Sequence, residues 1–154
     1  MLFRSGAVVR DRRITRVYHL AAVSFVPASW EHPTPVVEFA AASTASLLDA
    51  IVNGDREVRF FHAASAEIFG RPSECPQNEA TAIRPATPYG AAKALGHFLT
   101  GIYRERFGLH ASSGILFNHE SPRRPPEFVT RKITQGAVAI ARGEATELRL
   151  GNLD

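Results

Sequence analysis

Apolar residues recur every three or four positions in three stretches of the chain, and each stretch predicts an amphipathic helix. The first runs from Pro35 to Gly54, where we expect a left-handed residue to end it. The second begins with Thr87 as the N-cap and stops at Gly108. The third begins near residue 129 and closes at Gly143. The face that we expect the second helix to bury holds Ala92, Leu95, Leu99 and Ile102.

Four shorter runs of apolar residues, at 16–22, 57–64, 110–117 and 147–150, predict strands. A loop marked by prolines separates the second of these strands from the second helix. Strands that alternate with helices pair in parallel, through long right-handed crossovers. The pattern therefore predicts an α/β fold: a partial, doubly wound, Rossmann-like parallel sheet flanked by helices.

The composition excludes several classes of protein. Its 154 residues, 45% hydrophobic and 21% charged, are enough for one domain with a core. Arg16, Pro27 and Pro35 interrupt the longest apolar runs, so we expect no membrane span. The net charge is +3, and the arginines near the N-terminus lack an interleaved aromatic platform, so we expect no nucleic-acid binding.

Metal and disulfide chemistry are not expected either. Cys75 is the only cysteine, which excludes an internal disulfide and a thiolate-rich metal site and suits a reducing compartment. The six histidines show no spacing typical of metal ligands.

Polar residues gather where three predicted strands end, in the segments 20–24, 65–67 and 118–120. In doubly wound sheets, ligands bind beyond the carboxyl ends of the strands. Tyr89 and Lys93 lie four residues apart at the start of a predicted helix, so they share one face. A nearby ammonium lowers a tyrosine pKa, as a tyrosine base requires. Ser65, at the end of the preceding strand, completes a candidate catalytic set.

These residues resemble the extended short-chain dehydrogenase/reductases and, within them, the GDP-mannose 4,6-dehydratases. The similarity covers about residues 17–154. Its most specific part is the run Asn118–Pro122, followed by Glu127–Thr134. The segments 63–70, 88–93 and 148–154 are similar too.

The resemblance implies a lyase that uses NADP internally to convert GDP-mannose to its 4-keto-6-deoxy product. Tyr89 would be the first base, tuned by Lys93, and Glu67 the second base. Ser65 would hydrogen-bond the sugar oxygen. Residues implied to bind the cofactor are Leu20, Ala21, Ala22, Ser24, Lys93, His119 and Arg124. Those implied to bind the substrate are Ser24, Asn118 and Lys132. The family also implies a homo-oligomer in the cytoplasm.

On this interpretation, residues 1–15 are a divergent segment, 16–125 a partial NADP-binding domain with the catalytic residues, and 126–154 the start of the nucleotide-sugar region. No Gly-x-x-Gly-x-x-Gly turn precedes Tyr89 to hold a pyrophosphate. We therefore expect the 154 residues alone not to turn over GDP-mannose. Two alternatives remain: a non-catalytic remnant or interaction fragment, and another nucleotide-sugar epimerase or dehydratase of the same family.

Overall fold

The computed structural model describes residues 7–9 and 13–151, and its contacts divide the chain into two compact units, residues 1–117 and 118–154. Arg4, Arg10 and Arg12, from the arginine cluster near the N-terminus, lie outside the described residues. The functional boundaries expected at residues 15 and 125 stay predictions.

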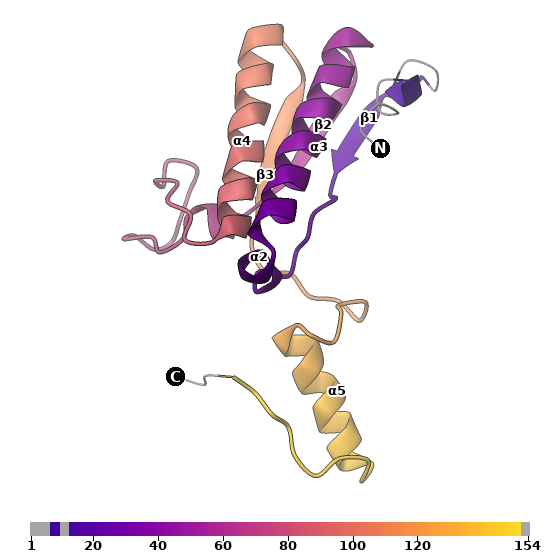
Figure 1. Ribbon diagram of the computed structural model, residues 1–154, viewed down its shortest axis with the longest axis vertical. Coiled ribbons are helices and arrows are strands. Elements are labelled where there is room, and N and C mark those ends of the chain that lie inside the picture. The colour runs from indigo at the N-terminus through magenta and orange to yellow at the C-terminus, as the bar shows by residue number, and fades with distance from the viewer. Residues whose placement is uncertain (1–6, 10–12, 152–154) are drawn as a thin grey trace. The chain divides into compact units, whose positions relative to one another are not determined.

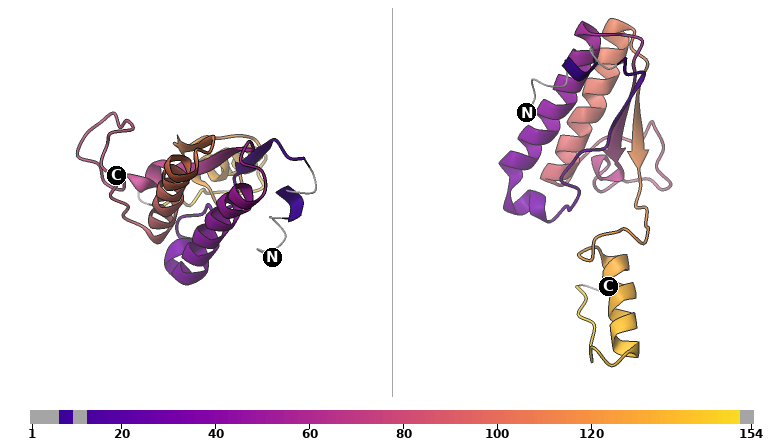
Figure 2. Two further views of the ribbon diagram at one scale, coloured as in Figure 1. Left: turned by 90° about the horizontal axis from the view of Figure 1, so that it is seen from above. Right: turned by 90° about the vertical axis from the view of Figure 1, so that its right-hand side faces the viewer.

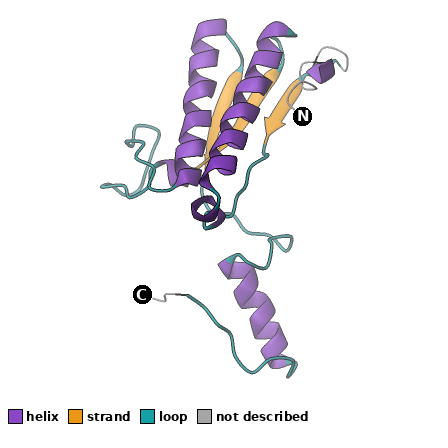
Figure 3. Cartoon of the chain, viewed as in Figure 1, coloured by secondary structure: helices purple, strands orange, loops and turns teal. Residues whose placement is uncertain are grey.

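A three-stranded parallel sheet forms the centre of the first unit (Figures 1 and 3). Its strands are β1 (Arg16–His19), β2 (Arg59–Ser65) and β3 (Ala111–Leu116), in that spatial order. Helices α3 (Pro33–Asn53) and α4 (Pro88–Phe107) lie on the same face of the sheet (Figure 2), and a short helix, α2 (Ala28–Glu31), precedes them. The predicted α/β fold with parallel strands is confirmed.

Helix α4 begins and ends where the sequence predicts. The Thr87 hydroxyl accepts a hydrogen bond from the Gly90 amide at 2.9 Å, and Pro88 occupies the first turn. Gly108 takes a left-handed conformation, with φ 66°. At the end of α3, by contrast, Gly54 has φ −106°, so the expected left-handed cap there is wrong. The Gly54 amide instead bonds the Ile51 carbonyl, which tightens the last turn.

The core lies between the sheet and the two helices, where Leu48 and Ile51 of α3 meet Phe60 of β2. Apart from Tyr89 and Lys93, the residues that α4 buries are small, among them Ala92, Ala94, Gly96 and Thr100. The expected face is therefore wrong in part: Ala92 is buried and Leu99 packs against the core, but Leu95 is 38% and Ile102 56% exposed. A Cβ on Gly96 would lie 2.4 Å from His62 Nε2, so the close packing of α4 on β2 requires glycine there.

By length and composition, α3 is apolar enough to cross a membrane, which corrects the expectation that no such run exists. Within the described part of the chain it is the one helix that meets this test. Core helices of globular proteins meet it too. Since Leu48 and Ile51 of α3 are fully buried against the sheet, the finding is weak evidence for a membrane span.

The second unit contains helix α5 (Val129–Ala141), followed by Gly143 with φ 71°. The strand expected at 147–150 is wrong, since these residues are irregular. A strand needs a neighbour to satisfy its backbone hydrogen bonds, and alternation of leucine with charged residues does not supply one. Glu147 and Arg149 instead pair with each other at 2.6 Å on the surface.

Candidate active site

The end of β2 turns directly into a short 3-10 helix, η1 (Ala66–Ile68), that carries Glu67. Ser65 caps this turn: its Oγ accepts a hydrogen bond from the Glu67 amide at 3.3 Å. Ile68 is fully buried next to Phe69, which anchors the turn in the protein. Ser65 and the half-buried Glu67 are therefore held at the carboxyl end of the central strand.

The first turn of α4 packs against η1. A Cβ on Gly90 would lie 2.5 Å from the Glu67 carbonyl oxygen, so the two backbones meet only because residue 90 is glycine. The Thr87 hydroxyl also donates to Glu67 Oε2 at 3.5 Å. These contacts join the segment of Ser65 and Glu67 to the helix that begins at Pro88 and carries Tyr89.

Tyr89 and Lys93 lie on the same buried face of α4, as their spacing predicts. Lys93 Nζ lies 5.7 Å from the centre of the Tyr89 ring. It donates a hydrogen bond to the Ala63 carbonyl of β2 at 2.7 Å, and the residue is only 6% exposed. Burial lowers the pKa of the Lys93 ammonium. The structure thus brings four predicted catalytic residues together at one edge of the sheet: Ser65, Glu67, Tyr89 and Lys93.

The predicted cofactor segment, Leu20–Ser24, follows β1 at the same edge of the sheet. β1 and β2 are parallel, and His19 pairs with His62. The segment that starts at Leu20 therefore leaves β1 next to Ala63 of β2. Leu20, Ala21 and Ser24 are exposed and Ala22 is half-buried. Of the three hydrogens of the Lys93 ammonium, one bonds to Ala63, and the others suit sugar hydroxyls. Within the first unit, Lys93 and the segment 20–24 are therefore the residues that could hold a cofactor.

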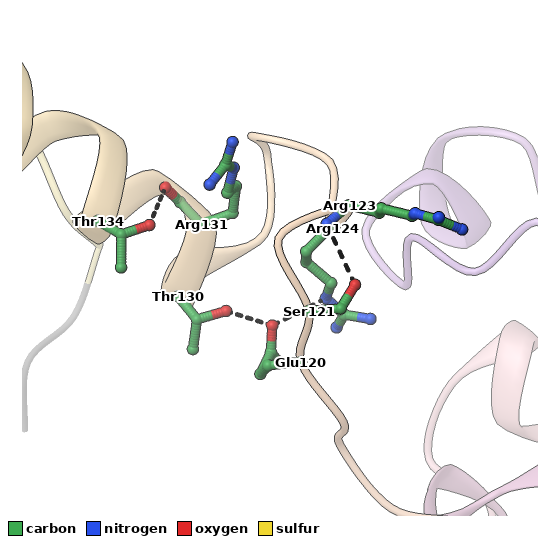
Figure 4. A network of polar contacts seen from close by, with 7 residues as sticks. All are labelled: Glu120, Ser121, Arg123, Arg124, Thr130, Arg131 and Thr134. Atoms are coloured by element: carbon green, nitrogen blue, oxygen red, sulfur yellow. Dashed lines mark hydrogen bonds and ion pairs between the residues drawn. The ribbon is translucent and has the colours of Figure 1, made fainter.

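The remaining predicted ligand residues belong to the second unit: Asn118, His119, Arg124 and Lys132. Glu120 organises this region (Figure 4), because it pairs with Arg124 at 3.2 Å and accepts a hydrogen bond from the Thr130 hydroxyl. The Arg124 guanidinium also lies 3.8 Å from the centre of the Phe128 ring. Asn118, His119 and Lys132 are exposed, the last of them on α5. Sequence analysis included Glu120 only in the polar segment 118–120 and did not pair it with Arg124, because a spacing of four predicts contact on a helix and these residues form a turn.

Two histidines form a buried pair beside Lys93 that the sequence analysis also missed. The His19 and His62 rings lie 5.4 Å apart, and His19 Nε2 hydrogen-bonds Thr44 Oγ1 at 3.1 Å. Among the described residues, neither ring nitrogen of His62 has a hydrogen-bond partner. Burial, reinforced by the Lys93 charge, lowers the pKa of His62 to about 3. The sequence does not reveal the register of the parallel strands, which places His19 opposite His62, 43 residues further along the chain.

The histidine pair does not extend to a metal site. Across residues 7–9 and 13–151, no three His, Cys, Asp or Glu side chains lie close enough together to hold an ion.

A parallel α/β sheet with serine, tyrosine and lysine at its carboxyl edge defines the short-chain dehydrogenase/reductase class. In agreement, the structure of UDP-glucose 4-epimerase from Brucella ovis in complex with NAD matches with a TM-score of 0.79 and 26% identity, over 96% of this chain and 46% of that one. The profile of the GDP-mannose 4,6 dehydratase family matches residues 4–154, and the chain belongs to that family.

Curated relatives agree with this assignment. The GDP-mannose 4,6-dehydratase of Sinorhizobium fredii (strain HH103) is 44% identical over 149 residues, which are 96% of this chain and 42% of the relative. GDP-mannose 4,6 dehydratase 2 of Caenorhabditis elegans is 44% identical over 141 residues, 90% of this chain and 37% of the relative. The chain therefore spans less than half the length of the curated relatives it matches.

Proposed function

We propose that this chain carries the catalytic residues of a GDP-mannose 4,6-dehydratase, a carbon–oxygen lyase. The observation that carries the proposal is the contact between η1 and the first turn of α4, which holds the segment of Ser65 and Glu67 against the helix of Tyr89 and Lys93. Membership of the dehydratase family supplies the substrate class.

Each of the four side chains has a chemical role in the proposed reaction. Tyr89 takes the proton of the sugar 4-hydroxyl, and the Lys93 ammonium favours its phenolate form. Ser65 hydrogen-bonds the same sugar oxygen. Once C4 is a ketone, the hydrogen on C5 is acidic, and Glu67 removes it and passes it to the hydroxyl that leaves C6 as water.

The proposed cofactor is NADP, held at its nicotinamide end by Lys93 and the segment 20–24. The resemblance to the family also implies a cofactor-binding role for His119 and Arg124. When bound, NADP supplies the acceptor and donor of the hydride. The resemblance to the family favours NADP over NAD. No contact to the pyrophosphate is assigned, because no Gly-x-x-Gly-x-x-Gly turn precedes Tyr89 in the sequence.

Ligand-dependent melting tests the substrate class. A ligand that binds only the folded state at 100 times its Kd stabilises that state by about 2.7 kcal/mol. We expect GDP-mannose to raise the melting temperature of this chain more than UDP-glucose or dTDP-glucose does at equal concentration. Equal protection by all three nucleotide sugars would contradict the assignment to GDP-mannose.

A C4 epimerase of the same class is the second candidate, favoured by the structural likeness to the Brucella ovis epimerase. Glu67 distinguishes the two reactions. Epimerisation at C4 needs only a hydride and the hydroxyl proton, whereas dehydration also needs a base for the hydrogen on C5. The placement of Glu67 next to the first turn of α4 therefore favours dehydration.

We also propose that the chain forms a homo-oligomer through the outer faces of α3 and α4. Large apolar side chains are exposed there, including Phe39 (47%), Phe98 (51%) and Ile102 (56%). A groove of about 1060 Å³ along α3, lined by Phe39, Leu47 and Leu99, continues this surface. Apolar patches of this kind mark protein–protein contacts, and a second copy fits because the face is equally available on each chain.

The oligomer is expected to dissociate when charge is placed on this surface. Replacing Phe98 and Ile102 with Glu should lower the mass measured by light scattering to that of one chain, while the circular dichroism spectrum stays unchanged. Val129→Glu, an exposed apolar position in the second unit, is the matched control and should leave the mass as it is. An unchanged mass in the double variant would contradict the proposed interface.

The proposal also covers the cellular location and the binding partners of the protein. We propose a cytoplasmic protein that binds a nucleotide sugar and neither nucleic acid nor membrane. The single cysteine, Cys75, is exposed and unpaired, in keeping with a reducing compartment.

A further inference from the structure

We propose that Thr87 is a positioning residue that fixes the carboxylate of Glu67 for proton transfer. The inference rests on the proposed role of Glu67 as the second base. Thr87 lies two residues before Tyr89, and sequence reasoning assigns it only a capping role. In the structure, its hydroxyl contacts both the first turn of α4 and the Glu67 side chain.

The hydrogen bonds of the Thr87 hydroxyl follow from its chemistry. A hydroxyl has one hydrogen and two lone pairs. The Gly90 amide donates to Thr87 Oγ1 at 2.9 Å, which occupies a lone pair and leaves the hydroxyl hydrogen for another acceptor. That acceptor is Glu67 Oε2, at 3.5 Å. The cap therefore directs the hydroxyl hydrogen toward the carboxylate.

The position of the Glu67 backbone is set independently of this bond. The Glu67 amide donates to Ser65 Oγ, and its carbonyl oxygen lies against Gly90. With the backbone fixed at both groups, the Thr87 bond selects the orientation of the side chain. It holds Oε2 toward the helix N-terminus, where the helix dipole favours a negative charge. Oε1 is then the oxygen that takes the proton from C5 of the sugar.

Three substitutions separate positioning from capping. Thr87→Ser keeps the cap and the donor. Thr87→Asp keeps the cap, because aspartate is as good an N-cap as serine, but it removes the donor and places a like charge next to Glu67. Thr87→Ala removes both. The melting temperature should therefore match the parent chain for Ser and fall for Ala, which loses the cap. For Asp, which keeps the cap, any fall measures its repulsion with Glu67.

The first readout is the ¹³C NMR signal of the Glu67 carboxylate in the unliganded 154-residue chain, assigned with Glu67→Gln. We expect this signal at neutral pH to be unchanged in Thr87→Ser and displaced in both Thr87→Asp and Thr87→Ala. A signal that moves only in Thr87→Ala, or in none of the variants, would overturn the proposal, because capping alone would then explain Thr87.

The second readout is deuterium uptake from D₂O at C5 of GDP-4-keto-6-deoxymannose, which needs the base but no hydride transfer. We expect Thr87→Ser to exchange at the parent rate and Thr87→Asp at least about 10-fold more slowly, within the range that general bases contribute. A parent rate in Thr87→Asp would overturn the positioning role. If the parent chain does not exchange C5 while the NMR result is as expected, the proposed function of Glu67 fails and the contact with Thr87 stands.

Discussion

Glu67→Gln should slow deuterium uptake at C5 of GDP-4-keto-6-deoxymannose by at least about 100-fold, because general bases contribute about 10²- to 10⁴-fold to such steps. Glutamine keeps the size and polarity of the side chain but cannot accept the proton. The Ser65 cap of η1 and the contact with Gly90 involve only the backbone of Glu67, so they should persist. Mass spectrometry of the recovered sugar nucleotide measures the uptake directly.

The matched control for this variant is Glu74→Gln, which changes an exposed glutamate in the loop before α4. It should exchange at the parent rate. Urea unfolding should show that Glu74→Gln, at an exposed position, retains the stability of the parent chain to within about 0.5 kcal/mol, and that Glu67→Gln remains folded. Exchange in Glu67→Gln as fast as in Glu74→Gln would exclude Glu67 as the base.

Acid should destabilise the chain well before its carboxylates are protonated, because His62 is buried in its neutral form. Its pKa falls from 6.5 to about 3 on folding, so the unfolded chain binds more protons below pH 6.5. The stabilisation is therefore complete above pH 6.5 and is lost as the pH falls toward 3. From these values, His62 alone should cost about 2 kcal/mol between pH 7 and pH 5.

The groups that face His62 act in the same direction. Lys93, His19 and His97 each disfavour a charge on its ring, and burial also lowers the pKa values of His19 and His97. Urea unfolding at pH 7 and pH 5 measures the effect. His62→Gln should lose about 2 kcal/mol less than the parent chain over this interval, whereas His110→Gln, at an exposed position, should lose as much as the parent. Equal losses in all three proteins would contradict this assignment.

Local signals predicted the elements of the first unit well. Thr87, Pro88 and Gly108 mark both ends of α4, since a hydroxyl cap, a proline in the first turn and a left-handed glycine each act within a few residues. The spacing of Tyr89 and Lys93 likewise fixed their common face. These features depend on residues that are close together in the chain, so they can be predicted from the sequence alone.

Features that depend on tertiary contacts were not predictable in this way. The apolar pattern of α4 favoured Leu95 and Ile102 as its buried face, but the sheet lies so close to the helix that small residues occupy the contact. The bond from Thr87 to Glu67 joins residues 20 positions apart through η1, a turn without a sequence signature. The expected strand at 147–150 failed for the same reason, because pairing depends on a partner.

The close approach of α4 to the sheet also governs how this chain can evolve or be engineered. Gly90 and Gly96 meet backbone and imidazole atoms at distances that leave no room for a methyl group. A library that randomises α4 should therefore recover glycine at both positions, as strictly as it recovers Tyr89 and Lys93. A scaffold that presents the tyrosine and lysine without small residues at these positions would therefore reproduce the Tyr-Gly-x-x-Lys spacing without the close contact between helix and sheet.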